Sequence, residues 1–473
     1  MTNTRERQVI GGITALALIG RLQAIFQPMR YDESVSWAYY IGRSWGTIAG
    51  TYKQPNNHVF FSLLSRLASA WVDYAPWALR LPAFLAGILI IPLIWLVGRR
   101  FADPRTGLLG AAFAAGAPAL VLYATNARGY SFIVAFFLAL LLVADRLCVA
   151  SSRALWISYA IMGALGLYTI PVMLYPLGVV ATWLALDLRR RDGADRRRRL
   201  IALALANISA LGIAAVLYAP IIWSSGVSAL TENKFVTASS WESFVIALPS
   251  MFLSTYASWT TPLPAWAALL VLLVALAGIR WPVSRQPPVL AAVVLWCGAL
   301  LIAMHRVPYD RVWLFILPLF LLAVARGVFV IGERLSARPI PAALLASASA
   351  LIIVAAEMSV HAAERNDDTG TFPDAEQVTR ILAPRLRTTD RVLAPIPAIG
   401  PLLYYFPRAN ADTALLTVPL ERVKRVFLVL DASRHQDLAW AVEHELIDPR
   451  YFSEPALVAR LREAVIWETH LRE

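Results

Sequence analysis

The stretch "ALRLPAFLAGILIIPLIWLVGRR", residues 78–100, decides the fold class of this chain. Its apolar part is about twenty residues long, which is the length an α-helix needs to cross a hydrocarbon core of about 30 Å. Arg99 and Arg100 end it abruptly, as is common where a span reaches a cytoplasmic loop. The stretch predicts a transmembrane helix at residues 77–98.

The composition of the whole chain extends this prediction. Of its 473 residues, 58% are hydrophobic and only 16% are charged. Soluble domains rarely exceed about half apolar residues, so the chain is expected to be an α-helical polytopic membrane protein. The apolar runs predict eleven spans, at residues 8–27, 77–98, 106–125, 129–145, 155–170, 172–187, 200–223, 262–279, 289–304, 312–331 and 340–360.

Two of these spans depend on a proline. The chain carries no charge between Arg153 and Asp187, and a single helix over that length would reach about 50 Å. Pro171 breaks such a helix, so we expect two short helices joined by a tight turn. A second uncharged stretch, 243–279, is expected to be an amphipathic segment followed by one span.

The basic residues indicate the orientation. The net charge is +12, but the arginines gather in short runs between apolar stretches, which argues against nucleic-acid binding. With a cytoplasmic amino terminus, the alternate loops that begin with Arg5 and Arg7 and include "LRRRDGADRRRRL" at 188–200 hold most of the basic residues. The same count puts Arg280, Arg285 and Arg338 inside and Lys234 outside. The positive-inside rule therefore places the other set of loops, which begins with residues 28–76, on the outer face of the membrane.

The composition changes near residue 361. An amphipathic helix is predicted at 371–387, buried strands at 390–397 and 425–431, and another helix at 436–447. We therefore expect a transmembrane domain at residues 1–360 and a small extracytoplasmic α/β domain at 361–473, which folds separately and is not catalytic. Cys148 and Cys297 lie in or beside different apolar segments, so neither a disulfide framework nor a CxxC metal site is available.

The first outer loop, residues 28–76, is too long for a plain connector. Its stretches 33–50 and 58–72 have apolar faces at helical spacing and predict two helices on the membrane surface. The loop opens with "RYDESVSWAYY", residues 30–40, where a helix would put Asp32, Ser36 and Tyr40 on one face. Asp32 or Glu33 could simply cap that helix, but a cap needs only one carboxylate.

Other outer loops carry arginines and aromatic residues. "YATNARGYS" at 123–131 contains Arg128 and Tyr130, and "HRVPYDRVW" at 305–313 contains His305, Arg306, Tyr309 and Arg311. Arginines at the ends of spans often serve as interfacial anchors. Set against a carboxylate that can take a proton from a hydroxyl, they also suit a reaction of a phosphate-bearing lipid with a nucleophile.

The ordered set "YDESVSWAYY", "QPNNHVFFSLL", "ALRLPAFLAGILIIPLIWLVGRR", "YATNARGYSF" and "RVPYDRVWLFILPL" resembles bacterial members of the C-type glycosyltransferase superfamily. These are relatives of the protein O-mannosyltransferases and the lipid A aminoarabinose transferases, and the resemblance covers roughly residues 10–330. It implies a multi-pass enzyme of the bacterial cytoplasmic (inner) membrane, in contact with membrane lipids. The enzyme would transfer a sugar from a polyprenyl-phosphate carrier to a lipid, glycan or protein acceptor at the outer face. It also implies that Asp32 is the catalytic base.

The candidate site follows from these motifs together. Asp32 and Glu33 are the predicted catalytic residues. The predicted substrate-binding residues are Lys53, Asn56, Asn57, His58, Arg128, Tyr130, His305, Arg306, Tyr309 and Arg311. No cofactor is predicted; a divalent metal held by Asp32, Glu33 and His58 is an open alternative with few ligands to support it.

Three other functions compete with this one. A polymerase acting on carrier-linked glycans would use the same outer-loop arginines. A transporter or flippase of lipid-linked sugars would need charged residues midway through its spans, where Arg21 alone stands. A membrane-anchored binding or assembly protein would leave the outer-loop cluster unexplained.

Overall fold

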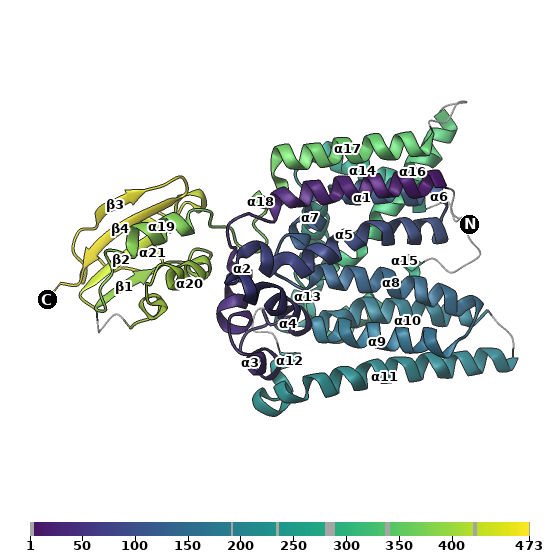
Figure 1. The fold of residues 1–473 in the computed structure, drawn as a ribbon, viewed down its shortest axis with the longest axis horizontal. Coiled ribbons are helices and arrows are strands. Elements are labelled where there is room, and N and C mark those ends of the chain that lie inside the picture. Colours follow the sequence, from purple (N-terminus) through teal and green to yellow (C-terminus); the bar gives the residue numbers. More distant parts are fainter. Residues whose placement is uncertain are drawn as a thin grey trace. The chain divides into compact units, whose positions relative to one another are not determined.

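The computed structural model describes residues 4–190, 193–232, 236–279, 289–335, 341–419 and 423–472 (Figure 1). Its contacts divide the chain into two compact units. The helical unit comprises Met1–Ile25 and Trp45–Glu364, and the tail unit comprises Phe26–Ser44 and Arg365–Glu473. The predicted boundary at residue 361 stays a prediction, because the tail unit also includes the start of the first outer loop. Lys234, Arg280, Arg285 and Arg338 lie outside the described residues.

Helices occupy every predicted span of the helical unit. They are α1 (Thr4–Ala24), α5 (Pro76–Phe101), α6 (Pro104–Ala115) with α7 (Pro118–Ala124), α8 (Tyr130–Val149), α9 (Arg153–Thr169), α10 (Leu174–Leu188), α11 (Gly193–Ser225), α14 (Ala265–Ile279), α15 (Val289–Met304), α16 (Leu317–Leu335) and α17 (Ala342–Val360). Among the described residues, six helices are long and apolar enough to cross a membrane, or up to eight if each bent pair counts as one span. The helical membrane fold is confirmed, whereas the number of eleven spans stays a prediction.

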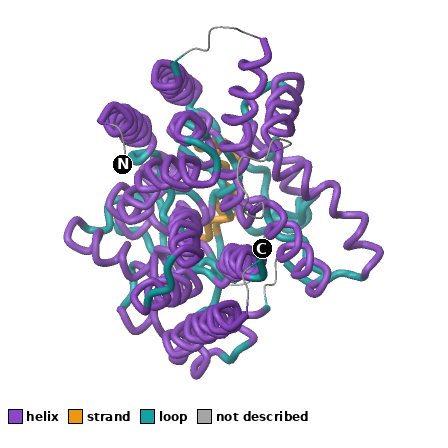
Figure 2. Tube along the Cα trace, turned by 90° about the vertical axis from the view of Figure 1, so that its right-hand side faces the viewer, coloured by secondary structure: helices purple, strands orange, loops and turns teal. Residues whose placement is uncertain are grey.

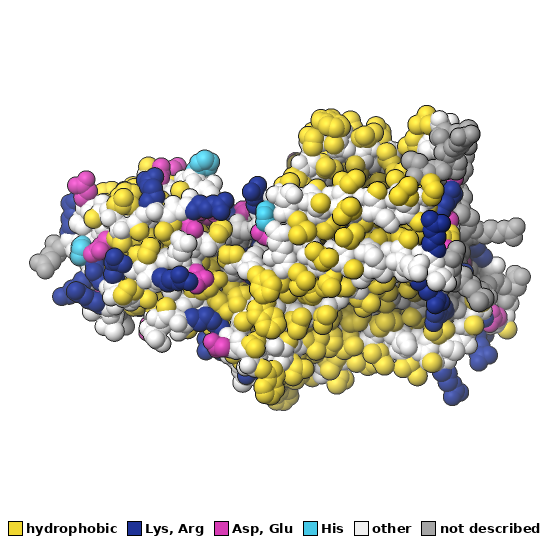
Figure 3. Space-filling view, turned by 45° about the horizontal axis from the view of Figure 1, so that its top comes forward, with side chains coloured by type: hydrophobic (Ala, Val, Ile, Leu, Met, Phe, Trp, Pro, Cys, Tyr) yellow, Lys and Arg dark blue, Asp and Glu magenta, His cyan; other side chains and the backbone are white. Residues whose placement is uncertain are grey.

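The surface of the helical unit is apolar on its flank. Figure 3 shows hydrophobic side chains over this flank, with basic side chains gathered at the end where α5 has Arg99 and Arg100 in its last turn. Exposed examples are Leu205 and Val216 on α11 and Leu269 on α14. Lipid tails are as apolar as these side chains, so lipid exposure carries no penalty. Figure 2 shows many of the helices of this unit nearly end-on, packed in several rows.

Breaks in the helices follow prolines. The predicted break at Pro171 is present: Ile170 is extended, and the 3₁₀ turn η3 (Pro171–Met173) leads into α10. Helix α13 (Trp241–Thr260) meets α14 at 99°. The span predicted at 106–125 is formed by two helices, because α6 and α7 meet at 64° across Gly116 and Ala117. Pro118 begins α7 and has no N–H with which to continue α6.

The first outer loop contains more helices than predicted. The predicted helix at 33–50 is divided into α2 (Tyr31–Ser36), the π-helical turn η1 (Trp37–Ile41) and α3 (Trp45–Gly50). Gly42 ends η1 by donating its N–H to the carbonyl of Trp37. The second predicted helix is present as α4 (Val59–Ser69), followed by the 3₁₀ turn η2 (Ala70–Val72).

The tail unit is built on a four-stranded sheet. Its strands are β1 (Asp390–Leu393), β2 (Arg425–Asp431), β3 (Ala456–Arg460) and β4 (Ala464–His470), in the order β1-β2-β4-β3. β1 and β2 are parallel, and the other pairs are antiparallel. The predicted helices and strands are present, with α19 at Ala375–Leu382 and α21 at Leu438–Glu443. The sequence did not predict α20 (Ile399–Arg408), β3 or β4.

Candidate functional site

The two carboxylates of the first outer loop lie in the tail unit and differ in role. Glu33 is fully buried, and its Oε1 accepts a hydrogen bond from the backbone N–H of Arg30 at 2.9 Å. Glu33 therefore closes the first turn of α2, as an acidic residue at the third helical position does in a capping box. One carboxylate of the pair is thus explained by helix geometry.

Asp32 is held through its backbone. Its N–H donates to the carbonyl of Thr369 at 3.2 Å, and its own carbonyl accepts from the Ser36 hydroxyl at 2.9 Å. The predicted helical face of Asp32, Ser36 and Tyr40 continues from α2 into η1, where Tyr40 is buried. Burial raises the pKa of the Tyr31 phenol, and the negative charge of Asp32 raises it further. The Asp32 side chain is thus oriented by a fixed backbone.

Two loops of the helical unit, distant in sequence, meet at His58. Its Nδ1 accepts a hydrogen bond from the backbone N–H of Gly129 at 2.8 Å. Its ring lies edge-on to Tyr130, with ring centroids 5.3 Å apart. The Arg128 guanidinium lies 5.9 Å from the centroid of Tyr130. The structure therefore brings together three of the predicted site residues.

The protonation state of His58 follows from this contact. Burial lowers the pKa of His58 well below its ordinary value of 6.5, and the positive charges of Arg128 and Arg311 lower it further. The imidazole is therefore neutral at physiological pH. Since Nδ1 accepts from Gly129, the proton resides on Nε2, which is a hydrogen-bond donor. Arg311, whose guanidinium also lies 4.5 Å from the Tyr309 ring centroid, belongs to the same electrostatic cluster.

Two predicted site residues of the 305–313 loop have partners within the helical unit. The Arg306 guanidinium donates to the carbonyl of Thr231 at 2.8 Å. The His305 ring packs against Trp241 and Phe244, with centroids 5.1 and 5.7 Å away. These two residues of the 305–313 loop are therefore occupied within the helical unit.

The loop between α3 and α4 is stabilised by Asn57. Its amide Nδ2 donates to the carbonyls of Ile48 and Thr51, at 2.9 and 3.0 Å. The carbonyl of Asn56 accepts from the N–H of His58 at 3.1 Å, and Lys53 is exposed in the same loop. Asn56 and Asn57 thus shape the turn that presents His58.

Some residues that contact the candidate site residues carried no sequence signal. The hydroxyls of Ser254 and Thr255 donate to Oδ1 of Asp310 at 2.7 and 3.2 Å and fix the start of the 310–316 turn, η4 (Asp310–Ile316). The N–H of Gly129 is equally invisible in the sequence, because any residue carries one. Within the described ranges, no three His, Cys, Asp or Glu side chains are grouped as metal ligands. Asp32 and Glu33 lie in the tail unit, whereas His58 lies in the helical unit.

Comparison with known proteins supports the resemblance. Residues 59–223 match the family of dolichyl-phosphate-mannose-protein mannosyltransferases. ArnT from Cupriavidus metallidurans, in the apo state, superposes with a TM-score of 0.59 over 96% of this chain and 97% of that one, at 13% identity. The chain has the C-type glycosyltransferase fold. No curated protein matches its sequence significantly.

Two further structures share this glycosyltransferase fold with lipid carriers bound. ArnT bound to undecaprenyl phosphate gives a TM-score of 0.58 and 14% identity, over 96% of this chain and 97% of that one. The oligosaccharyltransferase AglB from Archaeoglobus fulgidus, in complex with an inhibitory peptide and a dolichol-phosphate, gives 0.56 and 12%, over 98% and 74%. The C-type glycosyltransferase resemblance predicted from the motifs is confirmed.

Proposed function

We propose that this protein is an inverting glycosyltransferase. It transfers a sugar from a polyprenyl-phosphate carrier to a hydroxyl or amine of a lipid, glycan or protein at the outer face of the membrane. The observation that carries the proposal is the cluster of Arg128, Arg311 and neutral His58 in the helical unit. The carriers bound to ArnT and AglB are both polyprenyl phosphates, which supports the same class of donor here.

The cluster suits a phosphate leaving group. Arginine forks match phosphate oxygens, and the Nε2–H of His58 adds a neutral donor. As the bond between the anomeric carbon and the phosphate oxygen breaks, negative charge grows on the carrier phosphate. Fixed positive charges stabilise that change more than they stabilise the ground state, which lowers the barrier. Because His58 is neutral, it does not protonate the leaving group; its role is to orient the carrier phosphate through a hydrogen bond.

Asp32 is the proposed base. The acceptor hydroxyl gives its proton to the Asp32 carboxylate, and its oxygen attacks the anomeric carbon opposite the phosphate. As the new bond forms, the bond between the anomeric carbon and the phosphate oxygen breaks. The polyprenyl phosphate leaves with that electron pair, and the configuration inverts. Since Glu33 already closes α2, the Asp32 carboxylate is not needed as a cap. Glu33 accordingly has a structural role in this proposal, and Lys53 and Tyr130 stay candidates for substrate contact.

The test combines binding and turnover of the purified full chain in liposomes. The probes are undecaprenyl phosphate for binding and a panel of undecaprenyl-phosphate-linked sugars for turnover. Arg128→Gln and Arg311→Gln should each weaken carrier binding by about tenfold, the scale of one charge-assisted hydrogen bond. The control is Arg43→Gln, an exposed arginine whose Nε donates to the carbonyl of Ala38.

The carboxylate variants test the base. Asp32→Asn should bind the carrier normally and lose about 10²-fold or more in turnover. Glu33→Gln should be milder, because a glutamine oxygen can still accept from the Arg30 N–H. Turnover of Asp32→Asn close to that of the wild type would exclude Asp32 as the base.

A further inference from the structure

The segment that carries Asp32 folds with the tail unit. Phe26–Ser44 lies in the sequence between α1 and α3, which both belong to the helical unit. Its contacts nevertheless group it with Arg365–Glu473. Three independent sets of contacts within the tail unit hold it there: the hydrogen bonds of a buried arginine, a pair of backbone hydrogen bonds and an aromatic cluster.

Arg30 is the polar anchor. It is 1% exposed, and both of its terminal nitrogens donate to the carbonyl of Asn366 at 2.8 Å. One of them also donates to the Thr369 hydroxyl at 2.8 Å, while Nε donates to Oε1 of Gln27 at 3.2 Å. A buried guanidinium satisfied in this way is costly to displace, because removal of one partner leaves charge or polar groups unpaired.

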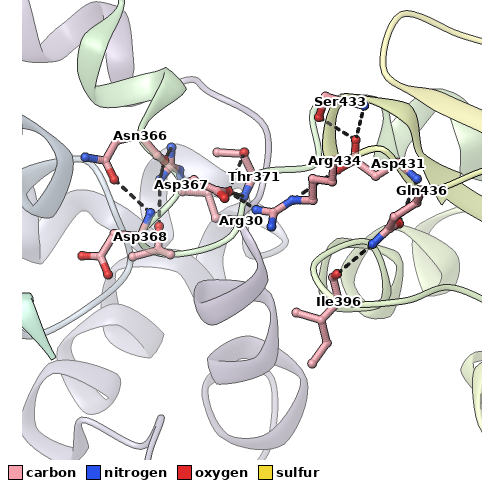
Figure 4. Close-up of polar contacts among 11 residues, drawn as sticks. Arg30, Asn366, Asp367, Asp368, Thr371, Ile396, Asp431, Ser433, Arg434 and Gln436 are labelled. Atoms are coloured by element: carbon pink, nitrogen blue, oxygen red, sulfur yellow. Dashed lines mark hydrogen bonds and ion pairs between the residues drawn. The ribbon is translucent and has the colours of Figure 1, made fainter. Parts of the chain in front are cut away.

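The turn that receives Arg30 is itself tied to the sheet. Figure 4 shows the side chain of Arg434 directed at Asp367, with which it forms an ion pair. Nε of Arg434 lies 3.5 Å from Oδ2 of Asp431, the last residue of β2. The chain of contacts from Arg30 through residues 366–369 to Asp431 therefore ends in the most buried strand of the tail unit.

The backbone pairing fixes the register of α2. The N–H of Tyr31 donates to the carbonyl of Gly370 at 2.9 Å, next to the bond between the Asp32 N–H and Thr369. Two glycines make room for Tyr31. A Cβ on Gly400 would lie 2.8 Å from its Cα and 2.5 Å from its ring, and a Cβ on Gly370 would lie 2.7 Å from its Cβ. Neither position tolerates a side chain unless Tyr31, and Asp32 with it, moves.

An aromatic cluster holds the other end of the segment. The Trp37 ring lies edge-on to Tyr404 with centroids 5.0 Å apart. The Arg408 guanidinium lies 3.7 Å from the Tyr404 centroid and 4.8 Å from that of Trp37. The hydroxyl of Tyr405 accepts from the N–H of Met29 at 3.2 Å. Helix α20 therefore contacts the segment on both sides of Asp32.

We propose that the tail unit positions the catalytic base. Arg30, Thr369, Gly370 and Gly400 are positioning residues that set the direction of the Asp32 carboxylate. This inference rests on the proposed role of Asp32. It gives residues 365–473 a function in catalysis, although in this proposal only Asp32 of the tail unit contacts the reacting atoms. It also bears on the prediction that the C-terminal domain folds separately, because residues 365–473 alone would lack the segment that covers Gly370, Gly400 and Tyr404.

The test uses full-length variants of the tail in liposomes, compared with Asp32→Asn. Thr369→Val removes one of the acceptors of Arg30 at nearly constant shape, and Thr369→Ser is the matched control that keeps the hydroxyl. Gly400→Ala adds one methyl group against Tyr31 without requiring an unusual φ. For each variant, kcat, the KM for the polyprenyl-phosphate sugar and hydrogen exchange over residues 26–44 are measured.

We expect Gly400→Ala and Thr369→Val to lower kcat by roughly 10- to 100-fold, the scale of a displacement of about 1 Å at a reacting group. The KM for the donor should change by less than about twofold, since the arginine cluster is untouched. Exchange should rise in residues 26–44 and not in α5 or α8, and Thr369→Ser should behave like the wild type.

Two results would refute the proposal that the tail unit positions Asp32. One is unchanged exchange over residues 26–44 in both variants, which would mean that these contacts do not hold the segment. The other is faster exchange with an unchanged kcat in an enzyme that Asp32→Asn inactivates. A fully active Asp32→Asn enzyme would instead refute the proposed base, and exchange alone would then decide whether the tail holds the segment.

Discussion

Arg21 supplies hydrogen-bond donors that the bend between α6 and α7 lacks. In a continuous helix the carbonyl of Ala114 would accept from the N–H of residue 118, but Pro118 has none. The fully buried Arg21 guanidinium donates instead, to Ala114 at 3.2 Å and to Ala115 at 2.5 Å. It also donates to Ala17 on its own helix at 3.2 Å. We predict that Arg21→Met destabilises the helical unit.

The magnitude follows from opposing contributions. Two buried carbonyls that lose their donors cost about 1–3 kcal/mol each, or roughly 2–6 kcal/mol together. Removal of the arginine also removes the penalty for burying its charge, which amounts to several kcal/mol and opposes the loss. We expect a net destabilisation of about 2 kcal/mol, and a Tm lower by roughly 2–6 °C. Arg21→Lys, with a single nitrogen, should fall between Arg21→Met and the wild type.

A double-mutant cycle with Pro118→Ala identifies the cause. Alanine at position 118 restores an N–H that can reach the carbonyl of Ala114. If Arg21 acts by replacing that donor, Arg21→Met should cost about 1 kcal/mol less in the Pro118→Ala background. The measurement is thermal unfolding in detergent, with the lipid-facing Leu22→Met as the control on the same helix. Equal losses in both backgrounds, or an unchanged Tm for Arg21→Met, would refute the reasoning.

Two further predictions concern charge and orientation. Folding lowers the pKa of His58, so its contribution to stability is present above the unfolded value of about 6.5 and is lost as pH falls below it. His58→Asn keeps an acceptor for Gly129 and does not titrate, so its Tm should rise relative to that of the wild type between pH 7.5 and 5.5. Parallel curves of Tm against pH for the two proteins would contradict this. A cysteine at Ser225, where α11 ends, should react with a membrane-impermeant maleimide in intact cells, and a cysteine at Gly193, where α11 begins, should not. The native Cys148 and Cys297 are buried and give the background of the assay. The reverse pattern would invert the proposed orientation.

The sequence predicted the positions of the helices because each apolar run is a local signal, and six of the described helices are long and apolar enough to cross a bilayer on their own. It failed where the geometry depends on a distant partner. The bend after α6 needs Arg21 from another helix, and the sequence showed Arg21 only as an isolated charge within a span. In the tail, β2 was evident because it is buried on both faces, while β3 is largely exposed and lacks the apolar run of a buried strand.

The candidate site was predictable in its residue types and less so in its contacts. The motifs brought His58, Arg128 and Arg311 to attention, and the structure gathers them. The hydrogen bond from Gly129 that sets the tautomer of His58 involves only a backbone N–H, so no residue type signals it. Arg306 and His305 looked equivalent to Arg311 in the sequence, but their partners, Thr231, Trp241 and Phe244, come from distant segments.

The adjacent carboxylates of "RYDESVSWAYY" now have separate explanations. Glu33 faces back onto the Arg30 N–H, while Asp32, one residue earlier, points about 100° away around the helix. In this chain Glu33 closes the first turn of the helix, which leaves Asp32 for the proposed role as base. The proposed base belongs to the tail unit, and the arginines proposed to bind the phosphate belong to the helical unit. Substitutions in the tail should therefore change kcat at constant donor KM, and substitutions of the arginines should change donor binding without loosening residues 26–44.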